Sequence, residues 1–250
     1  MRSTAMQTTD TNSIAALLLE IQVREWHGDW PSVERLASTA IERDDELADA
    51  YMRRALARRI LNVLQGPEGA IADYDRCIDI DPLNACAWEF RGGCRSTLAG
   101  RLPREHRIVM QALAEQDYRQ AAQLDPANEQ VGLSMIEAAI CAGRYREAFG
   151  YAGEAWSTVR SPCRRVVGAW LGCIAGILAK RPRRIWDKYH QALQARQAEL
   201  GALAWSVTEI SAALELLQGE GTCPPEALAE LQDVHELFLS HFEEGGPILR

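Results

Sequence analysis

The sequence lacks the short motifs that mark the common classes of enzyme. It contains no GxGxxG, no P-loop, no HExxH and no GxSxG segment. Its five histidines and seven cysteines include no CxxC pair and no His–Cys cluster with the spacing of metal ligands. These absences disfavour nucleotide-dependent, zinc-dependent and serine-hydrolase chemistry. We therefore expect a protein that is not an enzyme and that holds no metal or cofactor.

Long apolar segments are missing as well. No run of about eighteen apolar residues occurs, and the most apolar stretch, Val166–Ala179, is too short to span a bilayer. Residues 1–12 are polar and rich in Thr, without the apolar core of a signal peptide, and we expect them to form a disordered lead. The cysteines are odd in number and mostly lie in apolar helical patterns, which favours free thiols in a reducing compartment. A cytoplasmic protein without membrane insertion is predicted.

Two segments of the chain repeat one pattern. Gly69–Pro82 and Ala112–Pro126 each contain an Ala, an aromatic residue four positions later, a small residue three positions after that, and a closing Asp-Pro. Small residues allow two helices to cross closely, and Asp-Pro ends a helix because the residue before Pro is pushed out of the αR region. The repetition predicts stacked helical hairpins, with the pattern residues in their interior: Ala70, Tyr74 and Cys77, and then Ala114, Tyr118 and Ala121.

This pattern resembles the tetratricopeptide repeat, a helix–turn–helix unit of about 34 residues. Trp88 and Gly92 match the family's first helix, whereas Arg91 and Arg95 replace its Leu and Tyr. The implied fold is all-α, a solenoid of antiparallel hairpins. First helices would begin near Ile14, Ala48, Ala85 and Glu129, which gives four repeats over 14–47, 48–84, 85–128 and 129–162. The extra residues of the third repeat, after Pro103, are expected to lengthen its second helix.

After Pro162 the match fades, but helical periodicity continues. Apolar helix faces begin near Val166, after Pro182, near Leu203 and after Pro225. Residues 163–243 are expected to form divergent hairpins that cap the stack, because the last unit of a solenoid must hide an otherwise exposed apolar face. Residues 244–250 are expected to form a tail.

The formal charge of −8 conceals a polarised C-terminal half. Residues 160–197 hold nine basic residues against Asp187 alone, and residues 198–250 hold ten acidic residues against Arg250 alone. One interpretation of the basic turn at residues 180–186 is an anion site made by Arg181, Arg183, Arg184 and Trp186. The favoured interpretation is that the basic and acidic blocks neutralise each other. Nucleic acid is an unfavoured partner, because acidic residues outnumber basic ones over the whole chain.

Two arginine pairs, Arg54/Arg58 and Arg91/Arg95, have i, i+4 spacing at equivalent places in neighbouring repeats. Such pairs could form a row that binds carboxylates of a ligand. We favour an internal ladder of ion pairs, because buried charges need partners. The second helices supply suitable aspartates: Asp73, Asp75 and Asp117.

Members of the tetratricopeptide family typically bind a partner's peptide or helix in a groove lined by the first helix of each repeat. The Lys/Asn set with which some members grip the C-terminal carboxylate of heat-shock chaperones is absent, so that co-chaperone role is not expected. Met52, Phe90, Leu133 and Ile140 would suit a helical or extended ligand segment that carries apolar anchor residues. Carried onto this sequence, the lining positions are Leu18, Gln22, Glu25, Trp26, Asp49, Met52, Arg53, Leu56, Arg59, Ile60, Glu89, Phe90, Gly93, Ser96, Thr97, Gln130, Leu133, Ser134, Glu137, Ile140 and Cys141.

The resemblance implies a non-enzymatic protein-interaction module, namely an adaptor, assembly factor or chaperone that binds a peptide or helix of a partner protein. The alternative is an anion- or nucleic-acid-binding regulator that acts through residues 180–186. An enzyme whose site is assembled from scattered residues is the least favoured hypothesis. The sequence leaves open the identity of the partner and whether the array self-associates through its terminal hairpin.

Overall fold

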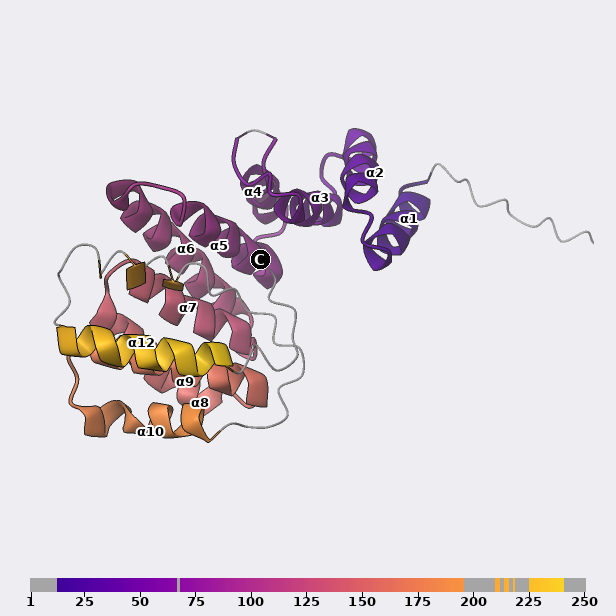
Figure 1. Cartoon of the computed structure of the whole chain (residues 1–250). Helices are drawn as coiled ribbons and strands as arrows, with labels where there is room; N and C mark the ends of the chain where they lie inside the picture. Colours follow the sequence, from indigo (N-terminus) through magenta and orange to yellow (C-terminus); the bar gives the residue numbers. More distant parts are fainter. Residues whose placement is uncertain are drawn as a thin grey trace, which may run out of the picture. The chain divides into compact units, whose positions relative to one another are not determined.

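The described part of the chain is helical throughout. The computed structural model describes residues 13–66, 68–195, 210–211, 214–215, 218 and 225–240. These residues form helices and no strand, which confirms the predicted all-α class (Figure 1). The predicted lead at 1–12, the tail at 244–250 and most of the helix expected near Leu203 lie outside the described residues.

The chain divides into two compact units, Met1–Cys94 and Arg95–Arg250, which are described separately below. The N-terminal unit contains α1 (Ile14–Trp26), α2 (Trp30–Arg43), α3 (Ala48–Ile60), α4 (Ala70–Ile80) and most of α5 (Ala85–Ala99). The C-terminal unit contains the end of α5, α6 (Arg104–Leu124), α7 (Glu129–Cys141), α8 (Tyr145–Thr158), α9 (Pro162–Leu178), α10 (Arg183–Gln194) and α12 (Pro225–Ser240). Helices α1, α3, α5 and α7 begin at the residues where the sequence pattern places helix starts.

Local sequence signals explain where several helices begin and end. Ser13 caps α1 by accepting a hydrogen bond from the Ala16 N–H at 3.1 Å, and Asp29 caps α2 by accepting from the Ser32 N–H at 3.3 Å. Helix α4 ends at Ile80 and α6 ends at Leu124, each immediately before an Asp-Pro pair. Helix α6 is 21 residues long and starts directly after Pro103, as the insertion in the third repeat predicts.

Small residues occupy the crossings between neighbouring helices. In the N-terminal unit Ala37, Ala55 and Ala57 have no exposed surface, and the repeat residues Ala70, Tyr74 and Cys77 are fully buried. In the C-terminal unit the equivalent residues Ala114, Tyr118 and Ala121 are also buried. The repeated sequence pattern therefore marks the interior of the hairpins, as expected.

Helix α9 is the centre of the C-terminal unit. It packs against α7, α8, α10 and α12 and carries an unbroken run of buried residues from Val166 to Ile177. Glycines at i, i+4 spacing let the aromatic side chains of α10 approach its backbone, because a Cβ atom at Gly172 would lie 2.9 Å from the Tyr189 ring and one at Gly176 would lie 2.8 Å from Trp186 Cβ.

Helix α12 covers α9 at the C-terminal end of the stack (Figure 1). The indole of Trp170 stacks on the ring of Phe238, with the centroids 4.1 Å apart and the planes 3° from parallel. Leu231 and Val234 are also buried against this core. The expected C-terminal capping segment is therefore present, and it closes an apolar face that α9 would otherwise expose.

Candidate functional site

In the N-terminal unit, three first helices carry the residues predicted to line a groove. The most exposed is Trp26, at the end of α1, with 88% of its surface accessible. Gln22 is exposed as well, whereas Leu18 is half-buried and packs against the interface of α1 with α2 and α3. An exposed tryptophan is unusual, because removing its large apolar surface from water is favourable.

Arg53 joins α3 to α1 on this side of the unit. Its Nη1 donates to Glu25 Oε2 at 2.5 Å, and its Nε donates to Asp49 Oδ2 at 3.0 Å. Burial raises the pKa of Glu25 above its usual value, and the Arg53 guanidinium opposes that rise. Both partners are about one-fifth exposed, so the pair is held in one geometry at the edge of solvent.

Arg59 joins α3 to α5. Its guanidinium lies over the ring of Phe90, 4.7 Å from the ring centroid, in a cation–π contact. Phe90 also lies 6.2 Å from the ring of Tyr74, and Met52 packs against the same core cluster. Phe90 and Met52 are thus half-buried, with part of each side chain held by the core.

We define the first-helix face by six predicted residues of α1, α3 and α5 that are exposed or half-buried in this unit: Gln22, Trp26, Met52, Arg53, Arg59 and Phe90. Three further predicted residues, Leu56, Glu89 and Gly93, are partly exposed on the same helices. Leu19 and Val23 were not predicted, although they are 63% and 43% exposed and share a helix side with Trp26 at i, i+4 and i+7. The sequence could have indicated them, because they are apolar residues that do not share the helix face of the buried Leu17 and Ile21.

Predicted groove residues in the C-terminal unit behave differently. Leu133 is 0% exposed and Ile140 is 2% exposed, and both belong to the core around α9. Helix α9 packs on α7 closely enough that a Cβ at Gly168 would lie 3.2 Å from Leu133 Cδ2. The side chains of Leu133 and Ile140 therefore offer no surface to a ligand, and neither belongs to the proposed site. Thr97 and Glu137 are partly exposed.

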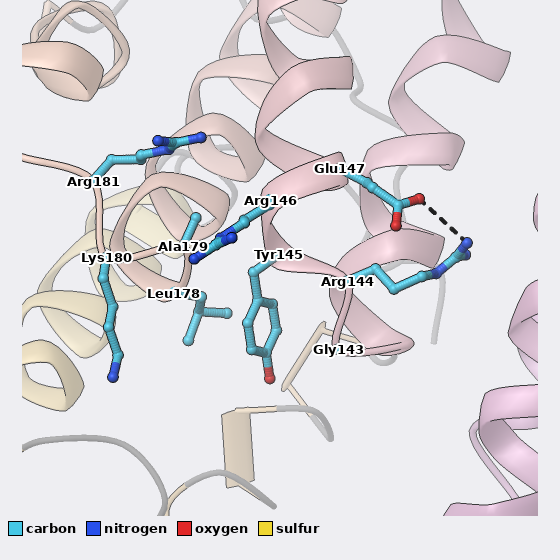
Figure 2. A pocket seen from close by; sticks show the side chains of 9 residues that line it. All are labelled: Gly143, Arg144, Tyr145, Arg146, Glu147, Leu178, Ala179, Lys180 and Arg181. Atoms are coloured by element: carbon cyan, nitrogen blue, oxygen red, sulfur yellow. Dashed lines mark hydrogen bonds and ion pairs between the residues drawn. The ribbon is translucent and has the colours of Figure 1, made fainter.

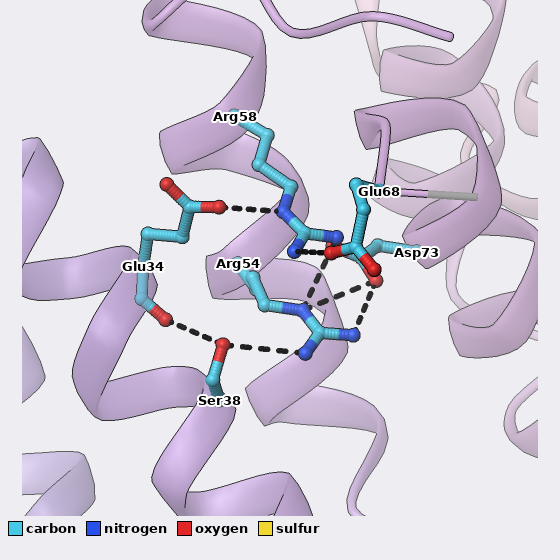
Figure 3. A network of polar contacts seen from close by, with 6 residues as sticks. All are labelled: Glu34, Ser38, Arg54, Arg58, Glu68 and Asp73. Carbon is cyan, nitrogen blue, oxygen red and sulfur yellow. Dashed lines mark hydrogen bonds and ion pairs between the residues drawn. The ribbon is translucent and has the colours of Figure 1, made fainter. Parts of the chain in front are cut away.

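The predicted arginine ladder is confirmed (Figure 3). Asp73 accepts from Arg54 Nη2 at 2.7 Å and from Arg58 Nη1 at 2.9 Å. Arg58 also donates to Glu34 Oε1 at 2.8 Å and to Glu68 Oε2 at 3.0 Å. The second arginine pair is also bound by aspartates of the second helices: Arg91 binds Asp75 at 2.6 Å and Arg95 binds Asp117 at 2.7 Å. Protein carboxylates therefore fill the places that a ligand's carboxylates would need.

The basic turn at 180–186 does not form one site. Trp186 is 1% exposed, and its indole Nε1 donates to the Arg181 carbonyl at 3.2 Å, so it is a core residue and cannot stack on a ligand. Arg183 pairs with Glu230 of α12 at 2.9 Å and with Asp187 at 3.5 Å. The first of these pairs joins the basic block to the acidic block, as the favoured interpretation predicts. Arg181 and Arg184 are exposed.

Among the described residues, no group of His, Cys, Asp and Glu side chains could hold a metal ion, and no helix is long and apolar enough to cross a bilayer. Burial raises the pKa of the Cys77 thiol to about 11 and that of Cys94 to about 12. A thiol of such high pKa is a poor nucleophile, because the thiolate is the reactive form.

The architecture is that of a helical-hairpin solenoid, and comparison with solved structures specifies its type. MamA matches with a TM-score of 0.62 at 13% identity over 76% of this chain and 97% of its own. YrrB, described as a TPR protein with an unusual peptide-binding site, matches with a TM-score of 0.61 at 10% identity over 84% and 94%. PilF of Pseudomonas aeruginosa matches with a TM-score of 0.58 at 16% identity over 93% of each chain. No family model and no curated protein sequence matches the chain. The chain therefore has the tetratricopeptide-repeat fold, as its sequence pattern predicts.

Proposed function

We propose that the chain is a non-enzymatic protein-interaction module that binds a segment of a partner protein on the first-helix face. The observation that carries this proposal is the exposure of Trp26, 88% accessible, on the same set of first helices as the Arg53–Glu25 and Arg59–Phe90 contacts. Tryptophan and arginine are the residues that most often dominate the binding energy of protein interfaces.

The contacts of the two arginines favour binding. Arg53 and Arg59 are already held by Glu25 and Phe90, so little side-chain entropy remains to be lost when a partner docks on them. Trp26, in contrast, has most of its apolar surface in water, and covering it supplies a favourable free energy of about 1.5–3 kcal/mol. A partner segment with one apolar side chain and flanking polar groups fits this combination.

The comparisons support the same class of function. YrrB shares the fold and is described as having a peptide-binding site. On this proposal the chain acts as an adaptor, assembly factor or chaperone in the cytoplasm, requires no cofactor, and recognises a peptide or helix. Self-association through the C-terminal hairpins would be a separate property.

The test is affinity purification with the immobilised full-length chain from cells that express it, followed by identification of the retained proteins. Trp26→Ala should remove the partners, because it deletes the exposed indole without touching the core. Leu83→Ala is the matched control, since Leu83 is an apolar residue 75% exposed in the turn between α4 and α5. The double variant Arg59→Ala with Phe90→Ala should also lose partners while its helical circular dichroism persists. Equal retention of the same proteins by wild type and Trp26→Ala would exclude the first-helix face.

A further inference from the structure

Two turns of the C-terminal unit have the same backbone conformation. The turn between α7 and α8 has Gly143 at φ 75°, and the turn between α9 and α10 has Lys180 at φ 54°. In each, the next residue donates its N–H to a carbonyl five residues earlier, from Arg144 to Ala139 at 2.8 Å and from Arg181 to Gly176 at 2.9 Å. This is the Schellman helix ending, and its left-handed residue is usually Gly. The chain therefore has a lysine where glycine is the ordinary choice.

The two turns border one cavity of about 590 Å³ (Figure 2). Its walls are the residues of the two turns and the first turn of α8: Gly143, Arg144, Tyr145, Arg146, Glu147, Leu178, Ala179, Lys180 and Arg181. Figure 2 shows Lys180 and Tyr145 extending to the same side, with Leu178 between them, while Arg146 reaches from α8 toward Ala179. A volume of this size lies within the range of about 300–1,000 Å³ typical of small-molecule sites.

The cavity has a large excess of positive charge. Four cationic side chains line it against the single carboxylate of Glu147. That carboxylate is 3.5 Å from Arg144 Nη1, and Arg144 also contacts Glu115, so this arginine is neutralised within the protein. Within the described part of the chain no carboxylate lies within ion-pair distance of Arg146, Lys180 or Arg181. Arg181 instead lies over the Phe149 ring, 5.9 Å from its centroid.

Like charges gathered on one concave surface repel one another, and the repulsion is relieved when an anion enters. The start of α8 adds to this field, because its first turn contributes the positive end of a helix dipole and Arg144 at its N-cap makes no side-chain capping hydrogen bond. Arginine and lysine together are the ordinary ligands of phosphate groups. The cavity also has an apolar part, made by the Tyr145 ring and Leu178.

We propose that this cavity binds a phosphate-bearing small molecule. Its phosphate groups pair with Arg146 and Lys180 in the field of Arg181, and its remaining part lies against Tyr145 and Leu178. An extended acidic peptide fits less well, because the lining residues are confined to the two turns and the first turn of α8. The proposal is independent of the first-helix face, which belongs to the other unit, so either one can fail alone.

The test is isothermal titration calorimetry of the full chain with inorganic pyrophosphate and with ADP, at constant ionic strength. Wild type should bind both saturably, and the double variant Arg146→Gln with Lys180→Gln should bind each at least about tenfold more weakly. The matched control is Arg160→Gln with Arg184→Gln, which removes the same charge from the basic block outside the cavity. This control should keep the wild-type affinity. Arg146 and Lys180 are both exposed, so folding should survive in the test variant, which circular dichroism checks.

Comparison of the two probes identifies what the cavity recognises. Tighter binding of ADP than of pyrophosphate, lost in Tyr145→Ala, would assign the ring wall to the organic part of the ligand. Equal affinity for both probes would assign the site to the phosphate groups alone, which also supports the proposal. Absence of saturable binding to wild type, or equal weakening in the control variant, would overturn it. Tighter binding of an Asp-rich decapeptide through the same two residues would overturn it in favour of an acidic peptide.

Discussion

Replacing glycine with alanine should lower the stability of the protein at Gly176 of α9 and raise it at Gly150 of α8. An alanine Cβ at position 176 would lie 2.8 Å from both Cβ and Cγ of Trp186. Ordinary carbon–carbon contacts are about 3.5–4.0 Å, so the gap must open by roughly 1 Å. Trp186 Cβ is attached directly to the α10 backbone, so this opening requires α10 to move. At Gly150 of α8, in contrast, an added Cβ meets nothing within 4 Å.

The magnitudes follow from two opposing effects. Overpacking a close-packed core costs about 1–3 kcal/mol. Replacing Gly by Ala inside a helix contributes about 0.8–1 kcal/mol of stability through the backbone. Gly176→Ala should therefore lower the free energy of unfolding by up to about 2 kcal/mol, whereas Gly150→Ala should raise it by about 1 kcal/mol.

Thermal unfolding followed by circular dichroism measures both variants against wild type. For a chain of this length a change of 1 kcal/mol shifts Tm by about 2–4 °C, so the two variants should separate by several degrees. Equal and parallel Tm shifts in Gly176→Ala and Gly150→Ala would refute the close approach of α10 to α9.

Three further predictions concern charged groups. Asp73→Ala should lower the free energy of unfolding by about 1.5–3 kcal/mol in urea titrations, because Arg54 and Arg58 lose the buried carboxylate that they share while Arg58 keeps Glu34 and Glu68. An effect as small as that of Glu46→Ala, which removes an exposed ion pair, would contradict this. Lys180→Gly should raise Tm, because a non-glycine residue in the left-handed conformation at φ 54° costs about 1 kcal/mol, and it should also weaken pyrophosphate binding. A lower Tm in this variant would argue against backbone strain at Lys180. Burial lowers the pKa of His235, so below about pH 6.5 the unfolded chain binds a proton at this residue that the folded chain does not bind, and the free energy of unfolding should fall from pH 7 to pH 5. His235→Gln should reduce this pH dependence, and an unchanged pH dependence in the variant would exclude His235 as its source.

Repetition is the reason that the fold could be predicted from the sequence. Ala70, Tyr74 and Cys77 recur with the same spacing as the residues of α6, and a pattern that must be buried in one hairpin must be buried in the next. Helix ends were equally predictable, because Asp-Pro acts on the backbone locally. None of this depends on distant parts of the chain.

The ligand-facing residues were harder to predict, because exposure depends on which helix packs on which. Leu133 and Ile140 occupy the groove positions of their repeat, but both belong to the core around α9. Gly168, which lets α9 approach Leu133, carries no apolar signal in the sequence. Trp186 lies on the apolar face of its own helix and is buried there. The sequence does not predict the cavity, because its lining residues Arg146 and Lys180 are far apart in the chain and are brought together only by the folding of two equivalent turns.

The arginines of α3 show how the fold prepares the first-helix face. Arg54 and Arg58, at i, i+4, are directed at Asp73 of α4, and Arg58 also reaches Glu34 of α2. These bonds tie three helices together through the planar, multiply donating guanidinium group, which a lysine ammonium could not reproduce. Because these bonds fix α3, its residues Arg53 and Arg59 contact Glu25 of α1 and Phe90 of α5 without needing a ligand to order them. Because a preordered surface loses less entropy on binding, the internal ladder contributes to affinity although no partner touches it.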